Sequence, residues 1–351
     1  MLNYQLNSFL IIIVLLSFSC KNKTSIDKPE EQTIAVDERN YVLDSLYPIG
    51  DVRRYGIYPD GVNNNTKHPN TGKYRIQTLL DFAEESQITI NFPKGYYGMN
   101  ILIDSRENIN FHFNQSGFSL IHITNEKGKE SKNINLRGTL IVYNRFGSYN
   151  SSDIKLDSLI LKTDINKSLE KLRNKGCHIY KGTKNLEIEY LEIDDLGSGG
   201  EKYKTNHAAL AIYGQKNNPQ NVSIQKTLIK SSDRHGAYIT GNNHYFGEII
   251  IEKYGLGNTN DMVGMQDAKI KDAHVLSGLW INRCNDCVFN NVTIITKNSP
   301  KGFPIKLDEG KLSKPTFIKT LKLDVPYQDD LVLDNVLTNI LVKRIETIDV
   351  K

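Results

Sequence analysis

The sequence predicts an all-β fold, a right-handed parallel β-helix (solenoid) with an N-terminal capping α-helix. From Asn108 onward, short segments that alternate apolar and polar residues recur, each opened by Asn or another turn residue. The segments 206–214 and 233–241 also align in phase, glycine on glycine, so that Ile212 falls on Ile239. Parallel strands stacked ~4.8 Å apart produce such like-on-like succession, whereas the hairpins of a sandwich do not.

The composition is that of an ordinary globular protein. The chain has 351 residues, of which 39% are hydrophobic and 24% are charged. The formal net charge of +4 is mild, and no run of Lys and Arg forms a phosphate-binding stripe, which argues against a nucleic-acid partner. We expect one folded domain over residues 46–351, as a monomer.

The N-terminus carries a targeting segment. The apolar run FLIIIVLLSF (9–18) has the length of a signal peptide, short of the ~20 residues that a membrane-spanning helix needs. A polar stretch with Cys20 at its boundary follows, and the whole resembles a bacterial lipoprotein signal. This resemblance implies a signal peptide over residues 1–20, lipidation of Cys20 and a flexible tether over residues 21–45. We therefore expect a location in the cell envelope, lipid-anchored to the outer membrane, or secretion.

The remaining cysteines indicate neither a redox centre nor a metal site. Cys284 and Cys287 have the spacing of a redox motif, but their surroundings predict strand, turn and strand. A reactive thiolate of such a motif belongs at the start of a helix, where its charge is stabilised. We interpret both residues, and Cys177, as buried or turn cysteines. No His and Cys spacing matches a zinc site.

The segment 55–104 resembles a known superfamily. It combines the turn YGIYPDG (55–61), an amphipathic stretch that predicts a helix over 74–86, and the strand end FPKGYY (92–97). These parts resemble the N-terminal segment of pectate-lyase-like parallel β-helix proteins. The resemblance implies a helix that covers the open end of the first coil. It also implies a protein that cuts or binds polysaccharides along a groove on one parallel sheet.

One outward face carries aromatic side chains. If Ala237 and Ile239 point inward, strand alternation makes their neighbours Gly236, Tyr238 and Thr240 point outward. The same phase makes Tyr213, Trp280 and Asn282 point outward, and His207 is expected at the edge of this face, so these four are the predicted substrate-binding residues. Aromatic rings offer apolar area for stacking on sugar rings. The alternative is that these aromatics pack beneath a loop.

A group of cations lies beside this face, in the stretch KSSDRHGAY (230–238). A polysaccharide lyase must neutralise a uronate carboxylate and remove the weakly acidic proton beside it. Arg234 offers a planar fork for the carboxylate, His235 or Lys230 could accept the proton, and Tyr238 could return one to the leaving oxygen. Clustered cations would lower the pKa of the base. The alternative is a structural turn in which Asp233 pairs with Arg234.

Two other functions stay open beside cleavage of an acidic polysaccharide by β-elimination. A glycoside hydrolase on the same scaffold needs two facing carboxylates, for which the candidates are Asp194, Asp195, Glu201, Asp261 and Asp267. A non-catalytic surface protein that binds glycans is the other. No cofactor is expected, although Asp261 and Asp267 in a long loop (256–275) could bind Ca²⁺.

Overall fold

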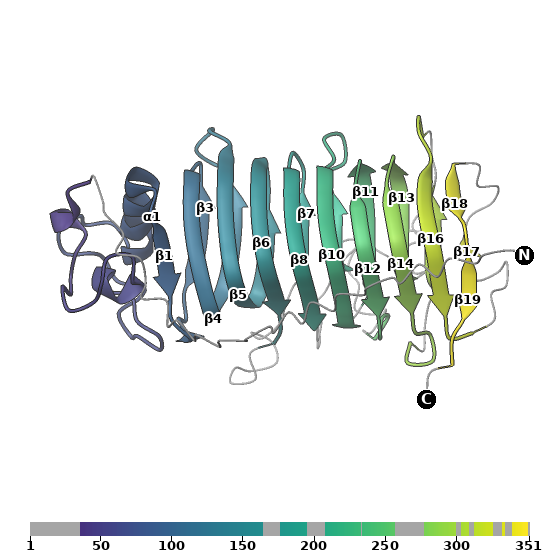
Figure 1. The fold of residues 1–351 in the computed structure, drawn as a ribbon, viewed down its shortest axis with the longest axis horizontal. Helices are drawn as coiled ribbons and strands as arrows, with labels where there is room; N and C mark the ends of the chain where they lie inside the picture. The colour runs from purple at the N-terminus through teal and green to yellow at the C-terminus, as the bar shows by residue number, and fades with distance from the viewer. Residues whose placement is uncertain are drawn as a thin grey trace, which may run out of the picture. The chain divides into compact units, whose positions relative to one another are not determined.

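A computed structural model describes most of the chain, and all described residues belong to one compact unit, Thr33–Lys351. The described residues are 36–163, 176–194, 208–232, 234–256, 277–299, 303–308, 312–325, 332–333 and 339–349. Strands dominate them (Figure 1). The helical elements are η1 (Glu38–Asn40), η2 (Val52–Tyr55) and α1 (Arg75–Ser86).

The strands follow one another along the chain. The first eight are β1 (Thr89–Phe92), β2 (Gly95–Tyr96), β3 (Asn100–Asp104), β4 (Glu107–Thr124), β5 (Ser131–Ser148), β6 (Ser151–Leu161), β7 (Cys177–Tyr180) and β8 (Lys184–Asp194). The next six are β9 (Ala208–Tyr213), β10 (Gln220–Ser231), β11 (His235–Asn242), β12 (Tyr245–Ile251), β13 (Ser277–Asn285) and β14 (Val288–Ile294). The last five are β15 (Phe303–Asp308), β16 (Thr316–Leu323), β17 (Val332–Leu333), β18 (Ile340–Val342) and β19 (Ile345–Thr347).

The long ladders are parallel and mostly join strands that are two apart in the chain. β6, β8, β10, β12 and β14 form one series, and β7, β9, β11, β13 and β15 form another. In the second series Ile239 lies opposite both Ile212 and Ile281, and Tyr238 lies opposite Trp280. The register predicted from the aligned glycines is thus confirmed. Each stacked Ile is fully buried, which contributes about 1.5–3 kcal/mol per side chain.

The prediction of an open right-handed parallel β-helix is wrong. The strands belong to one continuous hydrogen-bonded sheet, which closes into a parallel barrel of 7 strands. Register shifts at Phe113–Ser116 and Phe118–Leu120 interrupt the ladder of β4 with β5, and such irregularities bend a strand. A repeat in the sequence indicates which strands are neighbours, but it does not indicate whether their sheet closes.

The Asn that opens many segments has a conformational role. Residues with positive φ lie one above another where successive strands begin, namely Asn108, Asn133, Asp153, Asn185, Asn221, Asn243 and Asp286. Asn and Asp tolerate this left-handed conformation better than other residues with a Cβ. Their side chains also bond along the column: the amide of Asn185 donates to Asp153 at 2.8 Å, and that of Asn221 donates to Asn185 at 2.8 Å. The recurring Asn is therefore a turn residue that also ties neighbouring strands together.

The N-terminal part packs against the first strands. Helix α1 lies where the sequence predicts it and buries Leu79, Leu80 and Phe82. The turn at Asp60 is held by its backbone N–H, which donates to the carbonyl of Tyr96 at 2.7 Å. A Cβ on Gly95 would come within 2.5 Å of Pro59, so only glycine permits this contact. The two halves of the motif in segment 55–104 therefore contact each other.

Candidate functional site

The aromatic residues predicted on one face do lie together. Tyr238 and Trp280 contact each other with ring centroids 4.7 Å apart, and Tyr213 lies 5.9 Å from Tyr238. Ala208 and Ala211 complete the cluster, which is separate from the main core. We call these five residues the aromatic face. Lys306 continues it, with its Nζ 4.1 Å from the centroid of the Trp280 ring.

Gly236 departs from the predicted alternation. A Cβ there would lie 2.8 Å from Cγ2 of Ile251, a core residue, so Gly236 faces inward. Its neighbour His235 lies on the outer side instead, with its ring centroid 5.2 Å from that of Trp280. The expectation that Gly236 points outward is therefore wrong. The strict alternation of a strand is interrupted where the glycine allows close packing.

A bulge in β13 brings two polar side chains to one position of β11. Ile281 pairs with Ile239 and Cys284 pairs with Gly241, so Asn282 and Arg283 together oppose the single residue Thr240. Arg283 has a φ of 53°, a conformation that is uncommon for a residue with a long side chain. Bulges often re-aim a side chain beside a functional site. This one directs Asn282 and Arg283 to the same opening.

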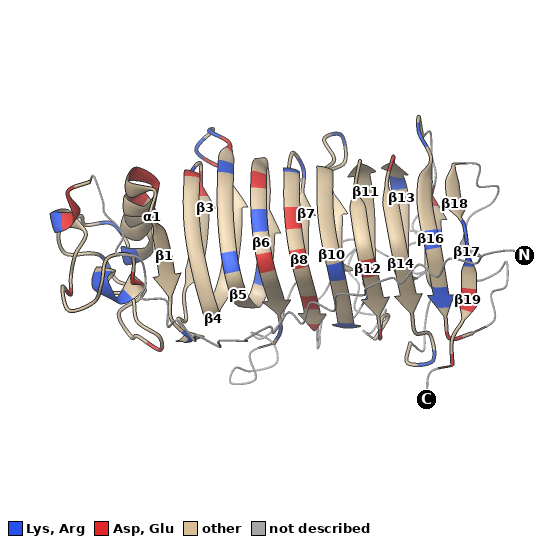
Figure 2. Ribbon diagram, viewed as in Figure 1, with Lys and Arg blue, Asp and Glu red and all other residues tan. Residues whose placement is uncertain are grey.

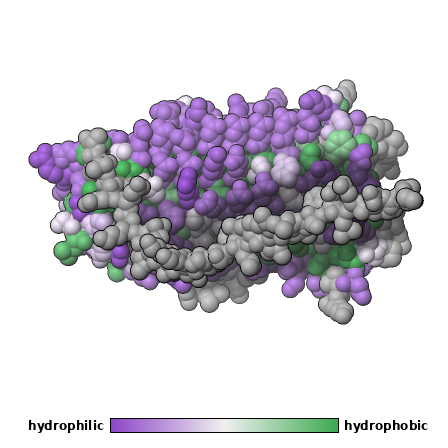
Figure 3. All heavy atoms as spheres, viewed as in Figure 1, coloured by the Kyte–Doolittle hydropathy of each residue, from purple (hydrophilic) through white to green (hydrophobic). Residues whose placement is uncertain are grey.

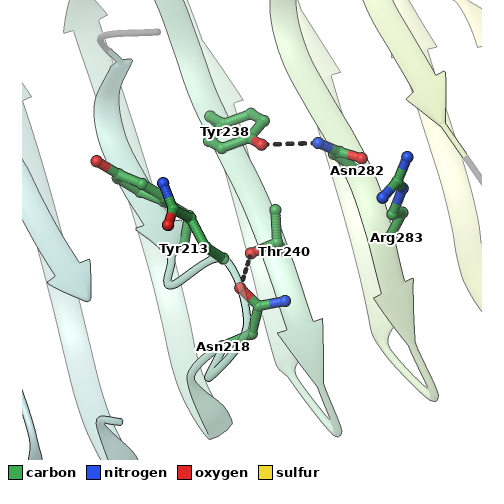
Figure 4. Close-up of a pocket in the computed structure, with 7 residues that line it drawn as sticks. Tyr213, Asn218, Tyr238, Thr240, Asn282 and Arg283 are labelled. Carbon is green, nitrogen blue, oxygen red and sulfur yellow. Dashed lines mark hydrogen bonds between the residues drawn. The ribbon is translucent and has the colours of Figure 1, made fainter. Parts of the chain in front are cut away.

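That opening is a small pocket beside the aromatic face (Figure 4). Its volume is about 130 Å³, and its lining consists of Tyr213, Gln215, Asn218, Tyr238, Thr240, Asn282 and Arg283. We call it the Tyr238 pocket. Drug-sized ligands generally occupy about 300–1,000 Å³. The Tyr238 pocket therefore suits one group of a larger ligand.

Tyr238 is positioned by a hydrogen bond at the pocket wall. The amide Nδ2 of Asn282 donates to its phenol oxygen at 2.7 Å. Burial raises the pKa of Tyr238, and the Asn282 hydrogen bond opposes this only in part. The phenol therefore keeps its proton near neutral pH and can donate it. Among the described residues, Asn282 Oδ1 is buried without a hydrogen-bond donor.

Asn218 is held on the opposite wall (Figure 4). Its Oδ1 accepts hydrogen bonds from the backbone N–H of Gly214 at 2.8 Å and from the hydroxyl of Thr240 at 3.0 Å. The Thr240 hydroxyl also lies 3.2 Å from the carbonyl oxygen of Ile212. Because Oδ1 is occupied, the Nδ2 amide is the end of Asn218 that can serve a ligand.

Arg283 supplies the positive charge of the pocket. Its side chain is 70% exposed, and its Nε lies 4.0 Å from Asp308, at the limit of an ion pair. An exposed pair at this distance contributes little to stability. The guanidinium is thus available to a carboxylate, for which its planar fork provides two parallel donors.

A second group of titratable residues adjoins the pocket through Tyr213. The rings of Tyr180 and Tyr213 lie 4.9 Å apart, and the Tyr180 hydroxyl lies 2.5 Å from Nδ1 of His178. Burial raises the pKa of Tyr180 well above its ordinary value. His178 opposes Ala211 in the strand register, which places this group next to the aromatic face.

Lys230 lies outside the Tyr238 pocket. Its Nζ pairs with Glu192 at 2.5 Å, and Glu192 also accepts from the Tyr190 hydroxyl at 2.7 Å. The hydrogen bond to Glu192 raises the pKa of Lys230, whereas we expected neighbouring cations to lower it. A lysine that holds its proton so firmly is poorly suited to act as a base.

Arg234 and His235 are fully buried, so neither lines the pocket. His235 lies between polar groups of its neighbours: its Nδ1 lies 2.9 Å from Ser277 Oγ and accepts from the Ser277 backbone N–H at 3.1 Å. Of the four predicted catalytic residues, the structure therefore places only Tyr238 in the pocket. The predicted substrate-binding residues Tyr213 and Asn282 line the pocket as well. Trp280 lies behind Tyr238 in the aromatic face.

Several predicted residues lie outside the described part of the chain. These are Cys20, Asp195, Glu201, His207, Asp233, Asp261 and Asp267. The signal peptide and most of the tether lie outside it as well. Asp194 is described, and its Oδ1 accepts from the Ser231 hydroxyl at 2.7 Å. Neither it nor any other carboxylate is among the described residues that line the Tyr238 pocket.

Cys284 and Cys287 form a disulfide across the turn between β13 and β14. Both are fully buried in that turn, as their strand–turn–strand surroundings indicate, but we did not predict the bond. Cys284 follows Arg283 directly, so the disulfide closes the turn next to the pocket. Cys177 is a free, buried cysteine.

Sequence reasoning missed Gln215, Asn218 and Arg283 as pocket residues. Gln215 and Asn218 lie between β9 and β10, and Arg283 lies at the bulge within β13, so the alternation of side chains indicates the direction of none of them. The signal was present at Arg283, because it follows Asn282 and precedes a turn marked by the two cysteines.

No family model, curated protein or solved structure matches the chain. The resemblance of segment 55–104 to pectate-lyase-like proteins therefore stays a prediction. Among the described residues, no helix has the length and apolar character needed to cross a membrane.

Proposed function

We propose that this protein is a carbohydrate-active enzyme that cleaves an acidic polysaccharide by β-elimination, with the Tyr238 pocket as its centre. The observation that carries the proposal is the convergence of Tyr238, Asn282 and Arg283 on one small opening. These residues supply a proton donor, an amide and a cation within a rigid sheet. Tyr213, the partly exposed member of the aromatic face, provides an apolar surface for a neighbouring sugar ring.

Arg283 would hold the uronate carboxylate. Its guanidinium can form two parallel charge-assisted hydrogen bonds with a carboxylate, and Asn218 Nδ2 can add a third. Withdrawing charge from the carboxylate acidifies the neighbouring C–H, which is the main electrostatic demand of the reaction. The described pocket lining has no carboxylate that would repel such a substrate.

Tyr238 would act as the general acid that protonates the leaving oxygen, and the proton removed beside the carboxylate would pass to a base, for which the sequence offers His207, one residue before β9. Its raised pKa keeps the phenol protonated, and the hydrogen bond that it accepts from Asn282 leaves its own hydrogen for a ligand. A glycoside hydrolase is supported less well, because its two carboxylates would have to face the bond that breaks. The described lining offers none.

A non-catalytic glycan-binding protein is the second candidate. It is favoured by the positions of the predicted bases, since Lys230 pairs with Glu192 and His235 is fully buried. In this case the Tyr238 pocket would bind the uronate without cleaving the chain. Under either function we propose that the protein acts in the cell envelope or outside the cell. The Cys284–Cys287 disulfide supports this, because such bonds persist in oxidising compartments.

Incubation with a panel of uronic-acid polysaccharides separates the candidates. A lyase creates an unsaturated bond that absorbs in the ultraviolet, so absorbance should grow with at least one polymer. A hydrolase would produce new reducing ends without absorbance. Retardation in an affinity gel without either product would leave binding as the function and contradict the lyase proposal.

A further inference from the structure

We propose a second binding site, a trough for an extended neutral polysaccharide on the face formed by β6, β8, β10 and β12. Two adjoining depressions of about 490 and 440 Å³ share Asp153 as a common wall. The larger one is lined by Asp153, Lys155, Asn185, Glu187, Asn221, Val222, Ser223, Asn243 and Tyr245. We call it the amide trough. It shares no residue with the Tyr238 pocket, so the proposal does not depend on the function given above.

The amides of the trough repeat from strand to strand. Asn185, Asn221 and Asn243 lie one above another at successive strand starts, about 4.8 Å apart. A side-chain amide has two N–H donors and two acceptor sites on its oxygen. The column uses one donor and one acceptor of Asn185. The other donor and acceptor are left for a ligand, so a regular row of amides can meet a chain of regularly repeated hydroxyls.

Each of the three carboxylates that line the two depressions has a lysine within ion-pair distance, Glu107 having Lys129 at 3.3 Å. Lys155 pairs with Glu187 at 3.4 Å, and Lys132 in the smaller depression lies 3.8 Å from Asp153. Figure 2 shows positive and negative residues on both β6 and β8. Because these charges are paired, the trough has no excess of positive charge to attract an acidic polymer, which distinguishes it from the pocket at Arg283. Figure 3 shows that most of the described surface in that view is hydrophilic, as a hydroxyl-rich ligand requires.

Tyr245 marks one end of the trough and provides an aromatic surface. Its phenol oxygen accepts from Asn290 Nδ2 at 2.7 Å, so its own hydrogen is free to donate. Asn290 Oδ1 is buried without a donor among the described residues. The same arrangement holds Tyr238 through Asn282 in the other site. Because the trough is built on strands and their turns, a ligand would lose little binding energy to ordering it.

The test is affinity electrophoresis of the full chain in gels that contain a neutral polysaccharide. The probes are a β-glucan, a galactomannan and an arabinoxylan, with polygalacturonate for comparison. We expect at least one neutral polymer to retard the protein. Ser223→Trp, which fills the trough at its centre, should weaken this binding at least tenfold, and Tyr245→Ala should weaken it similarly.

Two control variants locate the binding. Lys226→Trp adds the same bulk on β10 outside the trough lining, and Arg283→Asn alters only the Tyr238 pocket, so both should keep the affinity for the neutral polymer. Circular dichroism and the unfolding midpoint show that each variant is folded. The proposal is overturned if no neutral polymer retards the protein. It is also overturned if folded Ser223→Trp binds as the wild type does, or if Arg283→Asn abolishes binding.

Discussion

Tyr238 combines a buried ring with a reachable phenol. Its side chain is 8% exposed, and its oxygen accepts from Asn282 at the pocket wall. Tyr238→Phe removes only the hydroxyl and leaves the ring against Trp280. If the phenol is the general acid, turnover of an acidic polysaccharide should fall about 10²–10⁴-fold. Stability should change by only about 1 kcal/mol, because one hydrogen bond is lost.

The check is the rate of absorbance growth together with the affinity for the same polymer. Phe at position 238 should bind nearly as well as Tyr while turning over far more slowly. Equal rates for wild type and Tyr238→Phe would remove the phenol from the mechanism. Tyr190→Phe is a suitable control, because its hydroxyl bonds Glu192 outside the pocket.

His244 makes stability depend on pH. It is fully enclosed, with Nδ1 accepting from the backbone N–H of Val222 at 3.1 Å and Nε2 donating to the carbonyl of Thr240 at 3.0 Å. Burial lowers the pKa of His244 from 6.5 to about 4. The unfolded chain therefore binds the proton more readily than the folded one. The stabilisation is complete above pH 6.5 and is lost as the pH falls to about 4.

This loss amounts to roughly 3 kcal/mol over that range. Urea unfolding measured at several pH values should show it, and His244→Gln should flatten the slope. An identical slope in wild type and His244→Gln would contradict the assignment.

The column of left-handed residues gives a prediction for the strand starts. Asn185 has a φ of 52° and bonds both Asp153 and Asn221. Asn185→Gly removes these hydrogen bonds but keeps the conformation. Asn185→Ala also forces a Cβ into the left-handed region, which costs about 1–2 kcal/mol more. Urea unfolding should rank stability as wild type, then Gly, then Ala; Ala as stable as Gly would contradict this.

The disulfide in the turn between β13 and β14 leads to a further prediction about stability and ligand affinity. The Cys284–Cys287 bond closes a very short loop, so its loss should cost only about 2 kcal/mol. Replacing both cysteines by serine should therefore leave the protein folded. Because Arg283 adjoins Cys284, affinity for an acidic oligosaccharide should fall in the same variant. Unchanged affinity would mean that the disulfide does not position Arg283.

The strand register of the site was predictable from the sequence, whereas the burial of its individual side chains was not. Gly214 and Gly241 mark equivalent positions, so Tyr213, Tyr238 and Trp280 could be placed on one face from the period of a strand alone. Arg234 and His235 are fully buried, and the close approach of Gly236 to Ile251 beside them is a contact between distant residues that no short-range pattern reveals.

At the scale of the whole molecule, the closure of the sheet could not be predicted from the sequence. Periodicity reports the spacing between neighbouring strands, and closure depends on bends such as those within β4. The N-terminal helix was predictable, because its apolar residues recur with helical period over 74–86 and then bury against the first strands. The bulge that positions Arg283 was not predictable, because it becomes visible only when β11 and β13 are aligned.

The whole chain presents two chemically different sites, a cationic pocket beside the aromatic face and a trough of amides and paired charges around β10. The central claim concerns the first, that Arg283 holds the carboxylate of an acidic sugar. Calorimetric titration of an oligouronate into wild type and Arg283→Asn tests it most directly, because Asn tolerates the left-handed backbone and removes the guanidinium with its charge. Affinity should fall about 10–100-fold in Arg283→Asn, and the methyl-esterified oligosaccharide should bind both proteins equally weakly. Equal affinity of the two proteins for the free acid would contradict the claim.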